Sequence, residues 1–160
     1  GVERDFPIPP ADLHDGVRFH AIEANGASVM PSAQRMERAG TVLPVTLKEP
    51  LLPGKEIPVR IEWETSLPLQ TAIRMGQYGK HNWFVAYWYP HIAVYDDISG
   101  WHTHPFTGSA EFYYDFNDFE VNLTLPGNYM VWATGIQQDK AQIFQPTFWN
   151  ACSKLPKAKK

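Results

Sequence analysis

The amino-acid sequence predicts an all-β fold, built either as an antiparallel β-sandwich or as a saddle-shaped open sheet of about eight to ten short strands. Several segments alternate apolar and polar residues with a period of two, which is typical of strands with one face in a core and one in water. The 160 residues include 14 prolines and 11 glycines, which favour frequent turns. No segment has a clear helical period, so we expect little helix.

The first residues predict an extended lead-in. Residues 1–20 contain several prolines and little periodicity, with a strand expected near residues 17–22. Asn25-Gly26 is a strong turn signal, because both residues tolerate a positive φ. Residues 32–39 suit either one helical turn or a bulged strand.

The next two segments predict strands most clearly. Residues 41–48 and 56–64 both alternate apolar and polar side chains. Pro44 and Pro58 fall on the outer faces and indicate edge positions or bulges. The connection at residues 49–55, which contains prolines and a glycine, predicts a hairpin loop.

The middle of the chain predicts a loop and then a buried strand. Residues 66–82 are polar and are expected to form mainly loop. Residues 83–89 are almost wholly apolar, which predicts a strand buried on both faces. Residues 92–95 are expected to continue it, and Ile98-Ser99-Gly100 predicts a turn.

The last strands are predicted at residues 118–125 and 129–134, joined by the turn Pro126-Gly127-Asn128. After Gly135 the pattern fades. We therefore predict a single β domain at residues 1–135 and a partly disordered extension or linker at residues 136–160.

Composition limits the classes of function. A chain of 160 residues suits one domain and can bury roughly 70% of the surface that its unfolded form exposes. The net charge of −3 offers no basic face for nucleic acid. Cys152 is the only cysteine, which excludes an intrachain disulfide and a cysteine zinc site.

Membrane and targeting signals are absent from the sequence. No apolar run reaches the roughly 18 residues of a membrane span, so we expect no transmembrane segment. No signal peptide is visible, as is also expected of a mature chain. A periplasmic or secreted location is favoured over the cytoplasm.

Residues 83–135 hold most of the aromatic side chains and are the first place to look for function. An aromatic patch of this kind either binds carbohydrate or forms a core or an interface with a neighbouring domain. The residues expected to form this interface or ligand patch are Trp88, Tyr89, Trp101 and Tyr113.

Two histidines raise the alternative of a metal site. If their segment is extended, His102 and His104 lie on one face of it, and Asp96, Asp97 or Glu111 would complete the ligand set for a divalent metal. The simpler interpretation, that they are surface histidines in a loop, is preferred because two imidazoles do not make a site.

A set of carboxylates lies among the aromatic residues. Asp96, Asp97, Glu111 and Asp115 would suit a glycosidase, which pairs two carboxylates. The preferred interpretation is turn formation, because an Asp before Ile-Ser-Gly caps a bend through its side chain.

One sequence motif suggests covalent modification. Asn122-Leu123-Thr124 matches the acceptor pattern for N-linked glycosylation. The strand predicted there argues against it, and one match is expected by chance. Nucleophile elbows, phosphate loops, dinucleotide fingerprints and His-Glu-x-x-His are absent from the sequence.

A combination of turn and aromatic residues in residues 88–135 resembles a known family. Residues 89–97 read Tyr-Pro-His-Ile-Ala-Val-Tyr-Asp-Asp, and residues 118–126 read Asp-Phe-Glu-Val-Asn-Leu-Thr-Leu-Pro. Between them come Gly100-Trp101, Gly108 and Glu111-Phe112-Tyr113, and Ala133-Thr134-Gly135 closes the pattern. The pattern is similar to the amino-terminal domain of the aminopeptidase N family of zinc metallopeptidases (gluzincins).

The resemblance implies a saddle-shaped, non-catalytic β domain that packs over a thermolysin-like catalytic domain and forms one wall of the peptide cleft. In that family His-Glu-x-x-His and a later Glu hold zinc, and a Gly-x-Met-Glu-Asn strand grips the peptide. This chain has none of these motifs, so it is not expected to hydrolyse peptides alone. No cofactor is expected in it, and zinc would belong to the absent domain.

The partners that the resemblance implies are the downstream catalytic domain of the same polypeptide and a peptide substrate. The family's amino-terminal domain lends one Gln or Glu to the cleft shortly before the aromatic-Pro strand, and Gln77 is the candidate here. The alternative is a stand-alone β-sandwich module that binds carbohydrate or protein.

Overall fold

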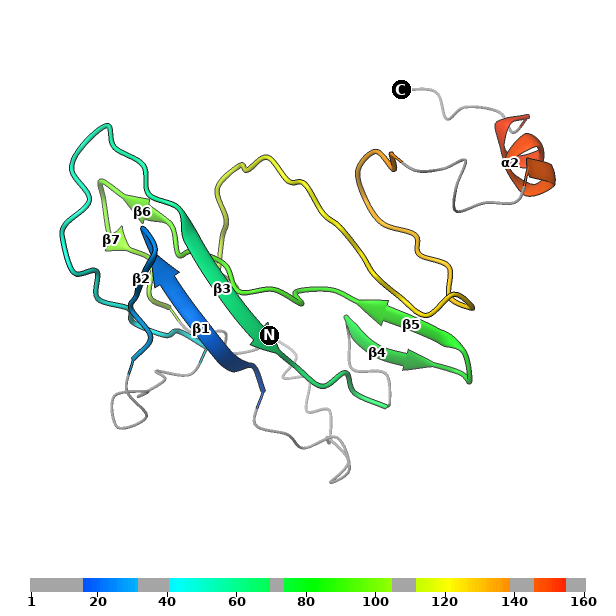
Figure 1. The fold of residues 1–160 in the computed structure, drawn as a ribbon, viewed down its shortest axis with the longest axis horizontal. Coiled ribbons are helices and arrows are strands. Elements are labelled where there is room, and N and C mark those ends of the chain that lie inside the picture. The colour runs from blue at the N-terminus through cyan, green and yellow to red at the C-terminus, as the bar shows by residue number, and fades with distance from the viewer. Residues whose placement is uncertain (1–15, 32–40, 70–73, 105–111, 139–145, 155–160) are drawn as a thin grey trace. The chain divides into compact units, whose positions relative to one another are not determined.

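The computed structural model describes residues 16–31, 41–69, 74–104, 112–138 and 146–154. By its internal contacts the chain divides into two compact units, Gly1–Asn117 and Asp118–Lys160, and each is described by itself. The described residues form short antiparallel strands and little helix, which confirms the predicted all-β class (Figure 1).

The largest sheet has three strands in the order β2-β1-β3 (Figure 1). Strand β1 is Arg18–Ala24, β2 is Ala27–Ser28 and β3 is Val59–Glu64. Asn25 and Gly26 join β1 to β2 with φ values of 50° and 73°, the left-handed pair that a two-residue hairpin loop requires. The predicted strand near residues 17–22 and the predicted Asn-Gly turn are both confirmed.

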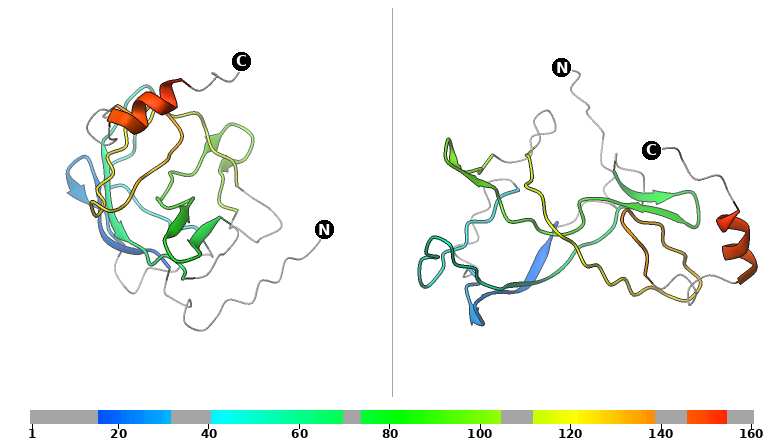
Figure 2. Two further views of the ribbon diagram at one scale, coloured as in Figure 1. Left: turned by 90° about the vertical axis from the view of Figure 1, so that its right-hand side faces the viewer. Right: turned by 90° about the horizontal axis from the view of Figure 1, so that it is seen from above.

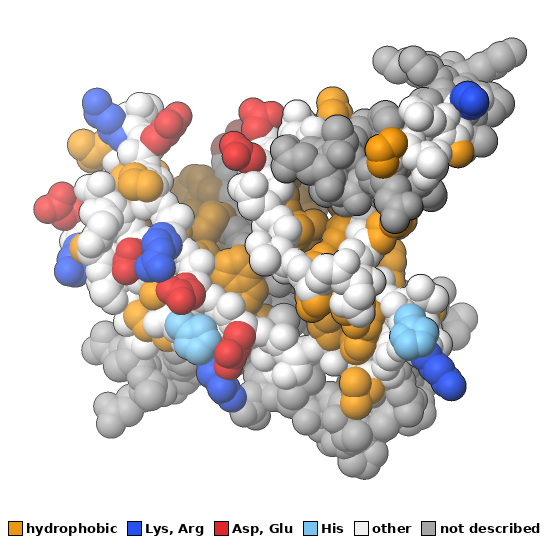
Figure 3. All heavy atoms as spheres, turned by 45° about the vertical axis from the view of Figure 1, so that its right-hand side comes forward, with side chains coloured by type: hydrophobic (Ala, Val, Ile, Leu, Met, Phe, Trp, Pro, Cys, Tyr) orange, Lys and Arg blue, Asp and Glu red, His pale blue; other side chains and the backbone are white. Residues whose placement is uncertain are grey.

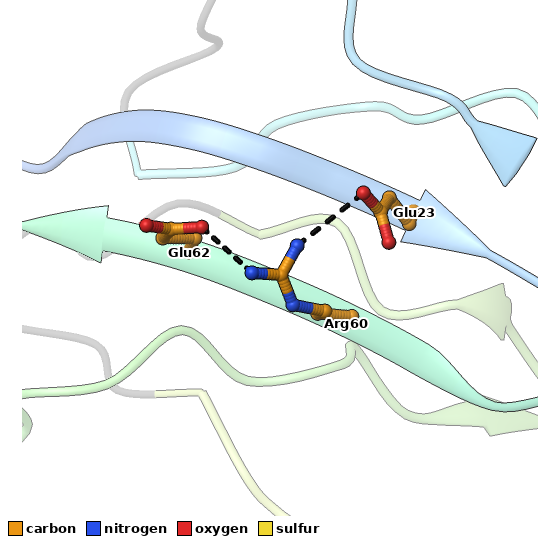
Figure 4. Close-up of polar contacts among 3 residues, drawn as sticks. All are labelled: Glu23, Arg60 and Glu62. Atoms are coloured by element: carbon orange, nitrogen blue, oxygen red, sulfur yellow. Dashed lines mark hydrogen bonds and ion pairs between the residues drawn. The ribbon is translucent and has the colours of Figure 1, made fainter. Parts of the chain in front are cut away.

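The alternation predicted for β3 determines what its two faces carry. Ile61 and Trp63 are half-buried, whereas the charged residues that alternate with them, Arg60, Glu62 and Glu64, are exposed. On the charged face, Arg60 lies between Glu62 of its own strand, at 2.8 Å, and Glu23 of β1, at 3.3 Å (Figure 4). This face of the sheet is therefore polar and suited to water.

Strands β4 (Met75–Tyr78) and β5 (Asn82–Val85) form a separate hairpin (Figure 2). The prediction that residues 66–82 are mainly loop misses β4, whose Met-Gly-Gln-Tyr sequence has no regular alternation. The prediction of a strand buried on both faces at residues 83–89 is wrong, because the strand ends at Val85 and the side chain of Phe84 is 52% exposed.

Strands β6 (Tyr95–Asp96) and β7 (Gly100–Trp101) form a third antiparallel pair. The amide of His102 donates to the carbonyl of Val94 at 2.8 Å, which extends the pair by one residue. The predicted turn at residues 98–100 is confirmed.

Residues 41–48 form no strand in the structure, apart from a single bridged residue at Val42. The expected hairpin between residues 41–48 and β3 is therefore wrong, and β3 pairs with β1 instead. The connection still contains a turn, in which the amide of Lys55 donates to the carbonyl of Leu52 at 3.1 Å. The alternatives given for residues 32–39 lie outside the described residues.

The second unit keeps its turn but not its strands. The amide of Tyr129 donates to the carbonyl of Pro126 at 2.9 Å, so the predicted turn is confirmed. The strands predicted at residues 118–125 and 129–134 are not formed. Helix α2 (Pro146–Ser153) was not predicted; it begins with a proline, which the first turn of a helix accepts.

Two broader predictions concern the layering of the sheets and the division of the chain into domains. The described residues form seven strands, fewer than the expected eight to ten, and a layered sandwich stays a prediction. So does the division into a β domain at residues 1–135 and an extension at 136–160. Among the described residues, no helix has the length and apolar character needed to cross a membrane.

Candidate functional site

The first unit contains a connected row of ring side chains, here called the aromatic ladder. It draws residues from β3, from the segment after β5 and from residues 112–114. Its members, in order of contact, are Trp63, Trp88, Tyr89, His91, Tyr114, Phe112 and Tyr87.

The ladder begins where β3 meets the segment after β5. The rings of Trp63 and Trp88 are stacked with centroids 6.2 Å apart, and the indole Nε1 of Trp63 donates to the carbonyl oxygen of Trp88 at 3.1 Å. The ring of Tyr89 meets that of Trp88 edge-on at 5.1 Å. A stacked ring and a hydrogen bond at one place therefore tie this segment to the sheet.

His91 occupies the middle of the ladder between two tyrosines. Its imidazole lies 4.1 Å from the ring of Tyr89 and 4.0 Å from that of Tyr114. Partial burial lowers the pKa of His91 below its ordinary value. The imidazole therefore stays neutral at physiological pH and acts as a flat ring within the stack.

The far end of the ladder is held by a charged group. Tyr87 meets Phe112 edge-on at 6.4 Å, and the Nη1 of Arg74 donates to the hydroxyl of Tyr87 at 2.6 Å. Tyr87 has a φ of 54°, in the left-handed region that costs a non-glycine residue energy. Strain of this kind persists only where surrounding contacts hold the residue in place.

A second group of polar residues lies on one face of the β6–β7 hairpin. The Oδ1 of Asp96 accepts hydrogen bonds from the amides of Ile98, at 2.9 Å, and Ser99, at 2.6 Å. The Oδ2 accepts a short hydrogen bond from the hydroxyl of Tyr113. The ring of His102 meets that of Tyr113 at 4.8 Å.

The ionisation of this group follows from its hydrogen bonds. The bond from Tyr113 and the amide of Ser99 lower the pKa of Asp96, and the bond to Asp96 raises the pKa of Tyr113. Asp96 is thus held as the anion and Tyr113 as the neutral phenol. Asp96 forms the turn, as the preferred interpretation of the carboxylates predicted.

The other face of this hairpin presents two exposed rings. Tyr95 and Trp101 are paired across the strands, and their rings meet edge-on at 5.2 Å. Their exposed fractions are 67% and 57%. Large rings that are this exposed mark a surface able to contact a ligand or a partner.

The structure therefore divides the predicted patch among three places, the aromatic ladder and the two faces of the β6–β7 hairpin. Trp88 and Tyr89 belong to the aromatic ladder. Trp101 packs on Tyr95, and Tyr113 packs on His102. Trp63 and His91 were not predicted as site residues, but both also belong to the ladder. For Trp63 the available signal was its inward place in the alternation of β3.

The two candidate metal ligands lie close together, with the rings of His102 and His104 at 5.3 Å. Within the described ranges, however, no group of three or more His, Cys, Asp or Glu residues is arranged to hold a metal ion. Glu111, a candidate third ligand, lies outside these ranges.

Gln77 lies on β4, opposite Trp83 of β5. Its Nε2 donates to the carbonyl of Lys80 at 3.0 Å, and its backbone amide donates to the carbonyl of Pro68 at 3.1 Å. In this state the side chain supports the hairpin turn. Its role in substrate binding stays a prediction. An open depression on the same hairpin is lined by Tyr78, Asn82, Trp83 and Phe84.

Comparison with protein-family models, with curated proteins and with solved structures gives no match to this chain. The family resemblance therefore rests on the sequence motifs alone.

Proposed function

We propose that this chain is the amino-terminal, non-catalytic β domain of an aminopeptidase N-like zinc metallopeptidase. The structural observation that supports the proposal is the large apolar surface of the described residues. Only Ile22 and Ala24 are buried hydrophobic residues there, whereas many large apolar side chains are exposed (Figure 3). Exposed apolar surface of this extent is typical of a region that packs against another domain.

The distribution of charge supports a particular orientation toward such a domain. The outer face of the β1–β3 sheet carries the ion pairs of Arg60 and of Arg18, the latter with Glu64 at 2.7 Å. A face of this kind is best left in water, because exposed ion pairs add little to stability and cost desolvation when covered. The exposed apolar residues of β4–β5, and separately those of the second unit at residues 118–132, would then be the ones that contact the neighbouring domain.

In the proposed protein the reaction takes place outside this chain. A zinc-activated water in the catalytic domain would hydrolyse the amino-terminal peptide bond. The β domain would supply one wall of the cleft, with Gln77 as the candidate contact to the peptide. Its amide would then exchange the carbonyl of Lys80, at 3.0 Å in this structure, for a group of the substrate.

The gene sequence beyond the codon for Lys160 tests the proposal. It should continue in frame to a His-Glu-x-x-His motif and a later Glu. A stop codon, or a continuation without that motif, would contradict the proposed parent enzyme.

Kinetics of the complete polypeptide test the role of Gln77. The variant Gln77→Ala should raise the KM for a leucine aminoacyl anilide roughly tenfold, the effect of losing about 1.4 kcal/mol of binding. The matched control is Asn82→Ala, on the opposite strand of the same hairpin. Equal KM values for Gln77→Ala and the unmodified enzyme would remove Gln77 from the cleft.

A second candidate function is a carbohydrate-binding module, favoured by the exposed pair Tyr95 and Trp101. Calorimetric titration of the chain with a glycan panel would detect saturable binding that Trp101→Ala abolishes. Absence of heat with every glycan would remove this candidate.

A further inference from the structure

Asn122 belongs to the only Asn-x-Ser/Thr sequence in the chain, Asn122-Leu123-Thr124. The middle residue is not proline, so the pattern required of a glycosylation acceptor is complete. The strand predicted at residues 118–125 argued against glycosylation at Asn122, but residues 118–125 form no strand in the structure.

The surroundings of Asn122 suit an acceptor. Asn122 and Thr124 are both exposed. Neither side chain makes a hydrogen bond to another described residue. The segment leads into the turn in which Tyr129 donates to Pro126, so it lies on an accessible stretch before a bend. A transferase can therefore bind this stretch as an extended peptide without breaking a sheet ladder.

We propose that Asn122 is an acceptor site for N-linked glycosylation. The co-substrate would be a lipid diphosphate-linked oligosaccharide, supplied with its transferase by a secretory pathway. The amide nitrogen of Asn122 forms a bond to C1 of the first sugar while the bond from C1 to the diphosphate oxygen breaks. The lipid diphosphate leaves with the electron pair of that bond, and the amide loses one proton.

A glycan at this position has a physical consequence for the chain. Phe119, Val121, Leu123 and Leu125 are 63%, 53%, 52% and 49% exposed, and they alternate with polar residues. A stretch with this pattern and no sheet partner among the described residues is a template for edge-to-edge association. A bulky, hydrated glycan on Asn122 would hinder such association.

The test is secretion of the full chain, carrying a cleavable signal sequence, from a eukaryotic host that performs N-linked glycosylation. Intact mass spectrometry should show an added core glycan, and a peptide N-glycosidase should remove it and convert Asn122 to Asp. Asn122→Gln and Thr124→Ala should lose the glycan, whereas Thr124→Ser should keep it. Asn128→Gln is the matched control, because Asn128 is not in an acceptor sequence, and it should remain glycosylated.

Two results would overturn the proposal: a secreted wild-type chain without added mass, or a glycan that persists in Asn122→Gln. The variants alter exposed residues outside any helix or strand, so secretion of comparable amounts of each shows that folding is not the cause of a lost glycan. None of these outcomes depends on a catalytic domain, so the result is independent of the proposed function.

Discussion

The strained backbone at Tyr87 predicts an unusual order of stability for two variants, in which glycine is more stable than alanine. At most positions glycine is less stable than alanine by about 0.5–1 kcal/mol, because glycine loses more backbone entropy on folding. Tyr87 has a φ of 54°, where a side chain costs roughly 1–2 kcal/mol that glycine does not pay. Tyr87→Gly should therefore be more stable than Tyr87→Ala, by about 0.5–1 kcal/mol.

Both variants lose the same side-chain contacts, which is why their difference isolates the backbone. Each deletes the edge-on contact with Phe112, typically about 0.5–1.5 kcal/mol, and the hydrogen bond from Arg74, about 1 kcal/mol. Both should therefore be less stable than the unmodified chain.

The assay is urea unfolding followed by far-ultraviolet circular dichroism, with the slope compared between variants to confirm that the same surface is exposed. The control pair is Phe84→Gly and Phe84→Ala on β5. There the usual order should hold, with alanine more stable by about 0.5–1 kcal/mol. If Tyr87→Ala is the more stable variant at position 87, the left-handed backbone and the strain assigned to it are both wrong.

Three further predictions concern the ladder, the β6–β7 turn and the β1–β2 turn. Trp63→Phe keeps a ring against Trp88 but loses the indole donor, so the free energy of unfolding should fall by about 1 kcal/mol, measured in urea; an unchanged value would mean that the indole bond contributes nothing. The pKa of Asp96 is lowered in the fold, so its stabilising contribution is complete above the ordinary value near 3.8 and is lost as pH falls through the lower folded value. Acid titration by near-ultraviolet circular dichroism should show this loss, and Asp96→Asn should remove it; identical profiles would contradict the assignment. Asn25→Ala places alanine at a φ of 50° and should cost about 1–2 kcal/mol in thermal or urea unfolding; a neutral effect would mean that the turn differs from the one described.

Short sequence patterns correctly predicted the turns and the strand whose conformation depends on neighbouring residues in the chain. Asn25-Gly26 predicted its turn because both residues accept the left-handed backbone. The Asp before Ile-Ser-Gly predicted the turn that Asp96 caps, because its carboxylate reaches the next amides. Strict alternation predicted β3 and the half-buried positions of Ile61 and Trp63, whereas Val59, expected on the same face, is 44% exposed.

The same sequence patterns could not predict which segments, distant along the chain, pair with one another. Residues 41–48 and 118–125 alternate as well as β3 does, yet neither forms a paired strand in the structure. Alternation states that a segment has two faces, but it does not identify a partner. Strand β4 was missed for the opposite reason, since Gly76 and Gln77 interrupt any pattern although the segment pairs with β5.

The same limit applies to the candidate site. The sequence shows that aromatic residues gather between residues 83 and 135, but Trp63 lies 25 positions before Trp88, to which it is bonded. The position of His91 between two tyrosines likewise depends on how residues 112–114 return to residues 87–91. Ring order in the ladder is a property of tertiary structure, so spacing along the chain does not give it.

Amide hydrogen exchange tests most directly the claim that the exposed apolar surface is covered by a neighbouring domain. Exchange would be measured by mass spectrometry on residues 1–160 alone and on the polypeptide that the whole gene encodes. Peptides covering residues 78–85 and 112–134 should exchange more slowly in the whole polypeptide, whereas those covering the polar β1–β3 face should not change. Equal exchange in both proteins at residues 78–85 and 112–134 would contradict the account.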